Sequence, residues 1–227
     1  MCIIEYLFKL FPTVSHIEEA DTFLEISEPP GYVFSYLPFQ EEPLGNNIVV
    51  DGWRQTIKYF PKTGVSVALE EAIPLERQQE LKAKYKTQEP CCFVHIRLGD
   101  YKILPHHQID VGTYIARASK HFPPKTRFLV FSDEANTYKE MLENFVKAVG
   151  HEPVVVTEED ELENLFLMSQ CGGAIVGNST FSWWGAYLAR QRCNDPRTFK
   201  ACYPVVWGQG LPPARDVIPP WGIPVQN

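Results

Sequence analysis

Hydrophobic and polar positions follow a repeating pattern in the second half of the chain. Short apolar runs with the length of buried strands lie at residues 91–96, 127–131, 153–156, 174–176 and 199–203. Stretches with helical spacing lie between them, at residues 111–121, 135–146, 161–171 and 182–190. A strand followed by a helix, repeated with short connections, predicts a parallel sheet with helices on both faces.

The first half of the chain has a less regular pattern. Helices are expected at residues 16–26, 53–60 and 75–86, and strands at 31–37 and 48–51. Pro90 marks a boundary before the regular part begins. The sequence therefore predicts an α/β protein with a reduced N-terminal α/β domain, residues 1–88, and a Rossmann-like parallel-sheet domain, residues 89–227. Beyond the last expected strand, the proline- and tryptophan-rich tail is expected to wrap over the surface.

Polar side chains follow three of the expected strands, at the points where these strands end. Residues 97–100 read Arg-Leu-Gly-Asp, residues 132–133 read Ser-Asp, and residues 178–182 read Asn-Ser-Thr-Phe-Ser. Ligands bind beyond the carboxyl ends of the strands in open α/β sheets, so we expect these three segments to converge on one site.

The third segment has the chemistry of a phosphate site. A helix that begins near Ser182 presents free backbone N–H groups and the positive end of its dipole, beside the hydroxyls of Ser179 and Thr180. The alternative is that one of these hydroxyls only caps the helix. With Arg97 on a neighbouring strand end, a diphosphate site becomes the favoured interpretation.

Each of the remaining candidates also has two interpretations. Asp133, next to Ser132, suits a ribose or the N1/N2 edge of guanine, or it caps the following helix. His95 contacts a phosphate or base, or it is a satisfied core histidine. Asp100 orients or deprotonates an acceptor group, or it holds Arg97 as an ion-pair partner. His106 and His107 are alternative bases.

Composition and charge exclude several classes of protein. The 227 residues are 44% hydrophobic, which is enough for an ample core, and the net charge of −7 argues against a duplex nucleic-acid binder. The six cysteines lack metal-ligand spacing and are expected to be free thiols in a reducing compartment. The apolar N-terminus is too short to span a bilayer and has no signal-peptide layout. We therefore expect a soluble, cytoplasmic protein, with peripheral membrane attachment left open.

Common nucleotide-site signatures are absent from the sequence. No glycine-rich dinucleotide fingerprint, no phosphate-binding loop ending in Gly-Lys-Ser/Thr and no nucleophile elbow is present. No two aspartates stand two residues apart, so the usual metal-chelating pair of metal-dependent sugar transferases is missing as well. Positive charge for a leaving diphosphate must then come from Arg97 and helix amides.

The same segments resemble the α1,2-fucosyltransferases of glycosyltransferase family 11. Residues 94–101, Val-His-Ile-Arg-Leu-Gly-Asp-Tyr, are similar to the family's motif His-x-Arg-Arg-Gly-Asp-Tyr. Residues 131–133, Phe-Ser-Asp, are similar to its second motif, and residues 167–171 with 178–187 to its third. Fainter similarity at residues 51–60 and 216–223 extends the resemblance to about residues 48–223.

The resemblance implies a fold of two Rossmann-like halves, of the GT-B type, and metal-independent transfer of fucose from GDP-fucose to a galactose-containing glycan with inversion. No cofactor is implied apart from this donor substrate. Carried over by motif, Arg97 binds the diphosphate, and His95 and Asp133 lie near the nucleotide. The remaining implied donor contacts are Asn178, Ser179 and Thr180.

Two departures from the family pattern motivate an alternative function. Leu98 replaces the second arginine of the motif, and no glycine-rich Gly-Gly-Leu-Gly-Asn-Gln segment opens the first strand. The alternative is a non-catalytic GDP-sugar-binding or interaction protein derived from this family. Binding of GDP without turnover of GDP-fucose would distinguish this non-catalytic protein from the transferase.

Overall fold

The computed structural model describes residues 10–11, 23–27, 36, 47–52 and 54–227. A six-stranded sheet has the order β5-β4-β3-β6-β7-β8, and every neighbouring pair in it is parallel. Its strands are β3 (Cys92–His95), β4 (Arg127–Phe131), β5 (Glu152–Val155), β6 (Gly173–Ile175), β7 (Lys200–Pro204) and β8 (Ile223–Val225). The predicted Rossmann-like parallel sheet is confirmed.

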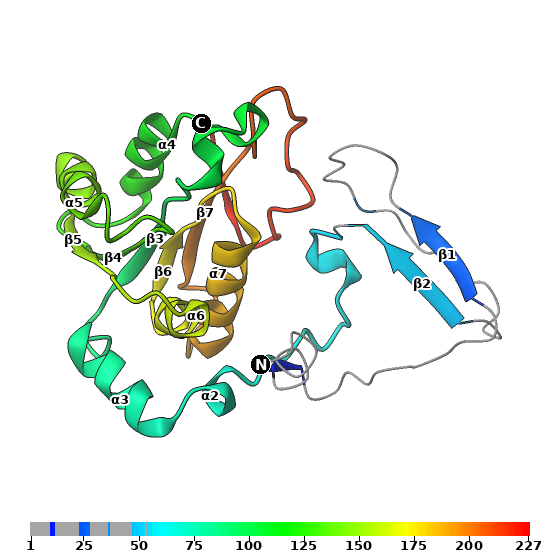
Figure 1. The fold of residues 1–227 in the computed structure, drawn as a ribbon, viewed down its shortest axis with the longest axis horizontal. Coiled ribbons are helices and arrows are strands. Elements are labelled where there is room, and N and C mark those ends of the chain that lie inside the picture. Colours follow the sequence, from blue (N-terminus) through cyan, green and yellow to red (C-terminus); the bar gives the residue numbers. More distant parts are fainter. Residues whose placement is uncertain (1–9, 12–22, 28–35, 37–46, 53) are drawn as a thin grey trace.

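Helices cover both faces of this sheet (Figure 1). They are α4 (Val111–Ala118), α5 (Lys139–Ala148), α6 (Glu161–Ser169) and α7 (Thr180–Arg192). Alternate strand residues enter two separate cores: Phe93 packs in the α6/α7 core and Val94 in the α4/α5 core. Strands buried on both faces explain the continuous apolar runs in the sequence.

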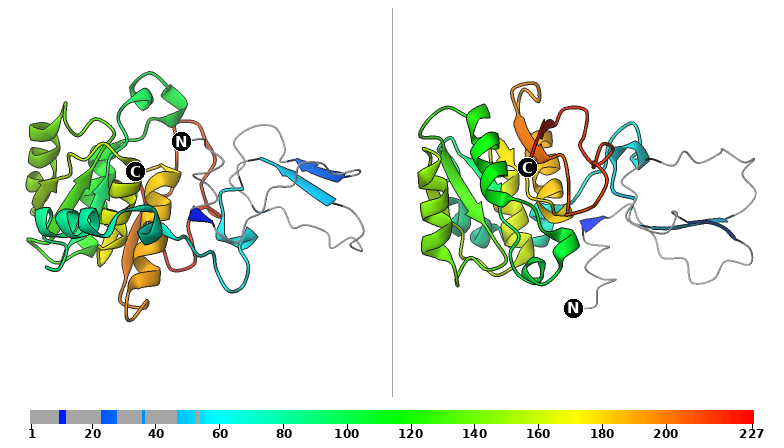
Figure 2. Two further views of the ribbon diagram at one scale, coloured as in Figure 1. Left: turned by 60° about the horizontal axis from the view of Figure 1, so that its bottom comes forward. Right: turned by 90° about the horizontal axis from the view of Figure 1, so that it is seen from above.

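The chain before β3 adds shorter elements. The described ones are β1 (Phe23–Ser27), β2 (Asn47–Asp51), α2 (Leu69–Ala72) and α3 (Leu75–Lys84). β1 and β2 form a parallel pair that lies apart from the large sheet in all the views (Figures 1 and 2). In contrast, α2 and α3 pack against α6. Leu69 of α2 and Leu81 of α3 are buried in the α6/α7 core. The domain boundary at residues 88–89 stays a prediction.

Short single-turn helices complete the described elements. They are η1 (Ile57–Tyr59), η2 (Asp100–Lys102), η3 (Pro105–His107) and η4 (Ser119–His121). η2 and η3 form the loop between β3 and α4, directly beside the strand ends that carry the candidate site residues.

Several expected elements in the first half are wrong. The helix expected at 53–60 is only the single turn η1, because Arg54 has a positive φ of 45° and Thr56 is extended. Of the helix expected at 16–26, residues 16–22 lie outside the described part, and residues 23–26 belong to β1, which pairs with β2. The strand expected at 31–37 lies outside the described residues except for Tyr36, which is not in a strand.

Boundaries in the second half shift by a few residues. α5 begins at Lys139, four residues later than expected, because residues 132–138 form turns along the edge of the sheet. The tail contributes β8, a strand absent from our expectations, which pairs with β7. The five cysteines in the described part of the chain are free, as expected; Cys91 and Cys92 point into opposite cores.

Candidate functional site

Three polar segments meet at one edge of the large sheet. β4, β3 and β6 are adjacent, and His95 at the end of β3 pairs with Phe131 at the end of β4. Because all three strands run in the same direction, the residues that follow them lie at the same edge, as predicted. This edge is where Arg97, Asp133 and the start of α7 are found.

Two carboxylates hold Arg97 in place. Arg97 Nη2 donates to Asp100 Oδ1 over 2.9 Å, and Arg97 Nε lies 3.2 Å from Asp133 Oδ2. The Tyr101 ring lies 5.7 Å from the guanidinium carbon. The ion-pair interpretation of Asp100 is therefore observed, and Asp133 is a second partner that sequence reasoning missed.

Asp133 also fixes the turn that follows β3. Its Oδ1 accepts the backbone N–H of Leu98 over 2.9 Å. A Cβ on Gly99 would lie 2.2 Å from Asp133 Oδ2, so only glycine allows the carboxylate to approach so closely. The predicted N-cap role is wrong for Asp133: it is the Ser132 hydroxyl that accepts the N–H of Glu134, and α5 begins only at Lys139.

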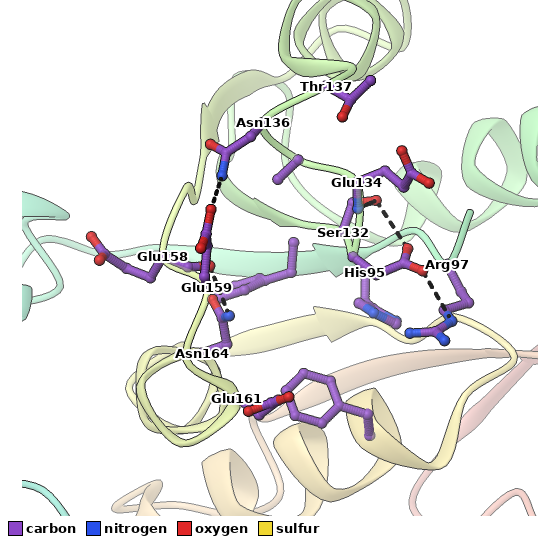
Figure 3. Close-up of a pocket in the computed structure, with 14 residues that line it drawn as sticks. His95, Arg97, Ser132, Glu134, Asn136, Thr137, Glu158, Glu159, Glu161 and Asn164 are labelled. Carbon is purple, nitrogen blue, oxygen red and sulfur yellow. Dashed lines mark hydrogen bonds and ion pairs between the residues drawn. The ribbon is translucent and has the colours of Figure 1, made fainter. Parts of the chain in front are cut away.

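A cavity of about 490 Å³ opens beside Arg97 (Figure 3). This volume lies in the range of about 300–1,000 Å³ that is typical of small-molecule sites. The predicted residues in its wall are His95, Arg97, Ser132 and Asp133. The rest of the wall consists of Phe131, Glu134, Ala135, Asn136, Thr137, Glu158, Glu159, Glu161, Asn164 and Phe181.

The start of α7 reaches the same cavity through Phe181. The N-cap residue Ser179 is extended and makes no side-chain capping bond, so its hydroxyl does not satisfy the first N–H groups of the helix. Ser182 is fully buried and donates to the carbonyl of Ser179. The hydroxyls of Ser179 and Ser182 thus do not cap the helix. The backbone amides at the start of α7 therefore remain available at the positive end of the helix dipole.

The hydroxyls themselves do not line the main cavity. Thr180 is exposed and lines a separate hollow of about 140 Å³, together with Arg54 and Trp184. The aromatic ring of Phe60 stacks on Trp184 with centroids 5.5 Å apart, which brings the segment before α2 against α7. Donor contacts from Ser179, Thr180 and Ser182 stay predictions, and Phe181 replaces them as the residue observed in the wall.

Asn178 organises the loops around the site. Its buried Nδ2 donates to the carbonyls of His107 and Trp207, over 2.7 and 2.9 Å. Its own carbonyl accepts the hydroxyl of Tyr101 over 3.0 Å. Asn178 also lines a second hollow of about 210 Å³ that shares Arg97 with the main cavity. The side-chain amide therefore holds loops together, and a donor contact stays a prediction.

His95 is a buried histidine without the partners expected in a core. It is 5% exposed, and its Nδ1 has no hydrogen-bond partner. Burial lowers the pKa of His95 to about 4, while the nearby Asp133 opposes this shift. The ring is neutral at pH 7 and lines the cavity beside Arg97 (Figure 3).

The carboxylates in the cavity wall differ in their partners. Glu158 pairs with Arg77 and Lys84, and Glu134 pairs with Lys102. Glu159 accepts a hydrogen bond from Asn136. The acidic run at residues 158–161 leads into α6, and Asp160 caps this helix by accepting the N–H of Glu163 over 3.0 Å. Its place in the cavity wall was missed, because polar residues at a helix start give the same signal with or without a cavity.

Two absences are found in the described part of the chain. No group of three or more His, Cys, Asp or Glu side chains there is placed to hold a metal ion. No helix there is both long enough and apolar enough to cross a membrane. Metal independence and location stay predictions.

Comparison with known proteins identifies a family and two proteins that this chain resembles. Residues 36–194 match the family described as glycosyl transferase family 11. The O-antigen biosynthesis glycosyltransferase WbnK of Escherichia coli is 35% identical over 104 residues, which cover 42% of this chain and 33% of that protein. An alpha-1,2-colitosyltransferase of Escherichia coli is 29% identical over 102 residues, which cover 42% of this chain and 35% of that protein. The matched stretch thus spans about a third of the length of either relative.

Proposed function

The chain belongs to glycosyl transferase family 11, and from this premise we propose that it transfers fucose from GDP-fucose to a galactose hydroxyl of a glycan. The transfer forms an α1,2 linkage, inverts the anomeric carbon and uses no metal ion. The name of one similar protein, an alpha-1,2-colitosyltransferase, makes GDP-colitose the second donor sugar to test. Donor, acceptor and linkage are all part of this proposal.

The cavity beside Arg97 is the observation that carries the proposal. Its volume of about 490 Å³ suits a nucleoside diphosphate, and its wall includes both Arg97 and Phe181, the second residue of a helix whose start no side chain caps. A guanidinium and helix amides are the groups that bind diphosphates in proteins without a glycine-rich loop. Their meeting in one cavity supports the donor site.

We place the chemical step at the Arg97 end of this cavity. The acceptor hydroxyl attacks the anomeric carbon, a new C–O bond forms, and the bond to the β-phosphate oxygen breaks. The electron pair leaves with GDP, whose growing negative charge is stabilised by Arg97 and the α7 amides. Asp100 is half-exposed and uses Oδ1 to hold Arg97; in this proposal Oδ2 orients the acceptor hydroxyl and accepts its proton.

The Arg97→Ala variant tests this proposal. Turnover of GDP-fucose, measured with galactose-terminated acceptors, should fall on the order of a hundredfold or more, because the leaving diphosphate loses its cation. Arg197→Ala is the matched control, since Arg197 is highly exposed and pairs only locally with Asp195. Equal turnover of Arg97→Ala and wild type would exclude the role of Arg97.

The second candidate function is donor binding without catalysis. The family motif has a second arginine where this chain has Leu98, and the Leu98 side chain packs against the α4/α5 core. Arg97 is left to share its charge with two carboxylates. Tight GDP binding with neither hydrolysis nor transfer of GDP-fucose would favour this candidate over the transferase.

A further inference from the structure

The main cavity has two ends with different chemistry. Arg97 and His95 lie at one side, and Asn136 and Glu159 lie at the other (Figure 3). The first side offers the guanidinium of Arg97, a cation that suits phosphates. The second side offers a carboxylate and a carboxamide and no cation, so it suits a neutral group that donates hydrogen bonds.

His95 is an independent sign that the cavity is built for a ligand. It is 5% exposed, its ring lines the cavity, and its Nδ1 has no hydrogen-bond partner. A polar atom that is buried without a partner costs free energy unless a bound molecule or water satisfies it. The neutral ring lies on the Arg97 side of the cavity, where a ribose or phosphate oxygen of a nucleotide would lie.

Of the carboxylates in the wall, Glu159 is held by a neutral partner. Asn136 Nδ2 donates to Glu159 Oε1 over 3.1 Å. Glu158 and Glu134 instead form ion pairs, and both oxygens of Asp133 are used by Leu98 and Arg97. Glu161, the remaining carboxylate in the wall, lies well away from Asn136 (Figure 3). Asp133, for which the sequence left a ribose or guanine contact open, therefore has both carboxylate oxygens occupied at the turn. Glu159 keeps an oxygen for a ligand, and Asn136 keeps its second amide N–H.

We propose that Asn136 and Glu159 recognise the Watson–Crick edge of guanine and so select a GDP-linked donor. This inference rests on the proposed function, because it assigns the base end of the same nucleotide site. Guanine presents two adjacent donors, N1–H and the 2-amino group, beside the acceptor O6. The Glu159 carboxylate accepts from both donors, and Asn136 donates its second N–H to O6.

The other bases match this pair less well. Adenine and cytosine present one amino donor beside an acceptor, and thus form two of the three hydrogen bonds. Uracil has a single N–H between two carbonyls, so one carbonyl oxygen faces the Glu159 carboxylate. A site built to pair with a donor discriminates strongly against a ligand that lacks it. Guanine is therefore the base that satisfies the whole pair.

Nucleotide affinities measured by titration calorimetry test this inference. The probes are GDP, UDP and inosine diphosphate (IDP), which is GDP without the 2-amino group. In Glu159→Gln we expect the affinity for GDP to fall about tenfold or more relative to wild type. The affinity for IDP should fall much less, so that the preference for GDP over IDP becomes smaller. Asn136→Ala should weaken GDP and IDP equally, because both bases carry O6.

The direction of the change in GDP affinity distinguishes lost hydrogen bonds from a general electrostatic effect. Removal of a negative charge near a diphosphate should by itself tighten binding, so weaker binding in Glu159→Gln reports lost hydrogen bonds. Glu140→Gln, at an exposed position in the first turn of α5, is the control for the change in net charge. Both Glu159 and Asn136 are exposed, so their variants should fold, and thermal unfolding verifies this.

Failure of this inference differs from failure of the proposed function. Unchanged GDP affinity in Glu159→Gln, or an equal loss for GDP, IDP and UDP, would overturn the role of the pair while leaving the transferase intact. No GDP binding by the wild-type protein would overturn both. If the variants show the predicted affinities but the wild-type protein transfers no fucose, base recognition would be supported and catalysis rejected.

Discussion

Replacement of Asp133 tests whether this carboxylate fixes the turn that carries Arg97. In the native protein, Asp133 accepts the Leu98 N–H over 2.9 Å and lies 3.2 Å from Arg97 Nε. Asp133→Ala removes both contacts. Asp133→Asn keeps a carbonyl oxygen for the Leu98 N–H and removes only the charge, so the two variants separate the hydrogen bond from the ion pair.

The structure sets the size of each effect. Loss of a backbone hydrogen bond to a carboxylate costs about 1–2 kcal/mol at such a partly exposed site. The ion pair contributes less than about 1 kcal/mol, because the Arg97 and Asp133 side chains are 35% and 20% exposed and solvent screens their charges. We therefore expect Asp133→Ala to lower the free energy of unfolding by about 2 kcal/mol, and Asp133→Asn by less than about 1 kcal/mol.

Urea unfolding measures the stability difference, and GDP titration gives the second readout. Asp133 acts as a positioning residue in this proposal. The Asp133→Asn variant should therefore have lower turnover than wild type, because Arg97 loses one of its two ion-pair partners. GDP affinity should hold or rise, since a negative charge beside the diphosphate is gone. Equal stability costs for the two variants would refute the hydrogen-bond argument. A large loss of GDP affinity in Asp133→Asn would instead make Asp133 a direct nucleotide contact.

Two further predictions concern buried residues. Burial lowers the pKa of His95 to about 4, whereas an unfolded histidine titrates near 6.5, so the unfolded state binds more protons between these pH values. Stability should therefore fall as pH drops from about 6.5 to 4, by roughly 3 kcal/mol in total; parallel pH profiles of wild type and His95→Gln would contradict this. A Cβ on Gly185 would lie 2.6 Å from Met168 Sδ, so Gly185→Ala should destabilise the protein by about 1–3 kcal/mol despite better helix propensity. In a Met168→Ala background this cost should shrink, because Sδ and Cγ are removed and only the Met168 Cβ, 3.0 Å away, remains; a Gly185→Ala protein more stable than wild type would refute the close approach of α6 and α7.

The sheet could be predicted from sequence because its strands are buried on both faces. Each strand is a continuous apolar run, and the helix between two consecutive strands predicts that they run parallel. Neighbourhood follows less directly, because β5 and β6 are joined by α6 but are not adjacent in the sheet. β4 was expected at residues 127–131, and the structure has it at Arg127–Phe131. β8 was not expected, because its sequence Ile-Pro-Val is short and its partner β7 is adjacent in space only after the tail has folded back.

The site could be predicted only in part, for a related reason. Strand ends are local features, so the positions of Arg97, Asp133 and the start of α7 followed from the pattern. The hydrogen-bond and ion-pair partners of each side chain depend on distances between segments that are far apart in sequence. The bond from Leu98 to Asp133 and the place of Glu159 in the cavity wall are of this kind. In the first half, the positive φ of Arg54 broke a helix that its sequence favours.

The balance of charge around Arg97 decides how a diphosphate is held. Asp100 and Asp133 together outnumber the single guanidinium that they hold, and Leu98 adds no charge. Arg97 alone therefore cannot neutralise a diphosphate, although its Nη1 makes no hydrogen bond in the described protein. In the proposed site the remaining positive potential comes from the backbone amides at the start of α7, where the N-cap residue Ser179 makes no side-chain capping bond. These amides are fixed in direction before a ligand arrives, so in the proposed reaction they would stabilise the charge of the leaving group without rearrangement. In this arrangement the carboxylates orient Arg97, and the helix supplies the rest of the attraction.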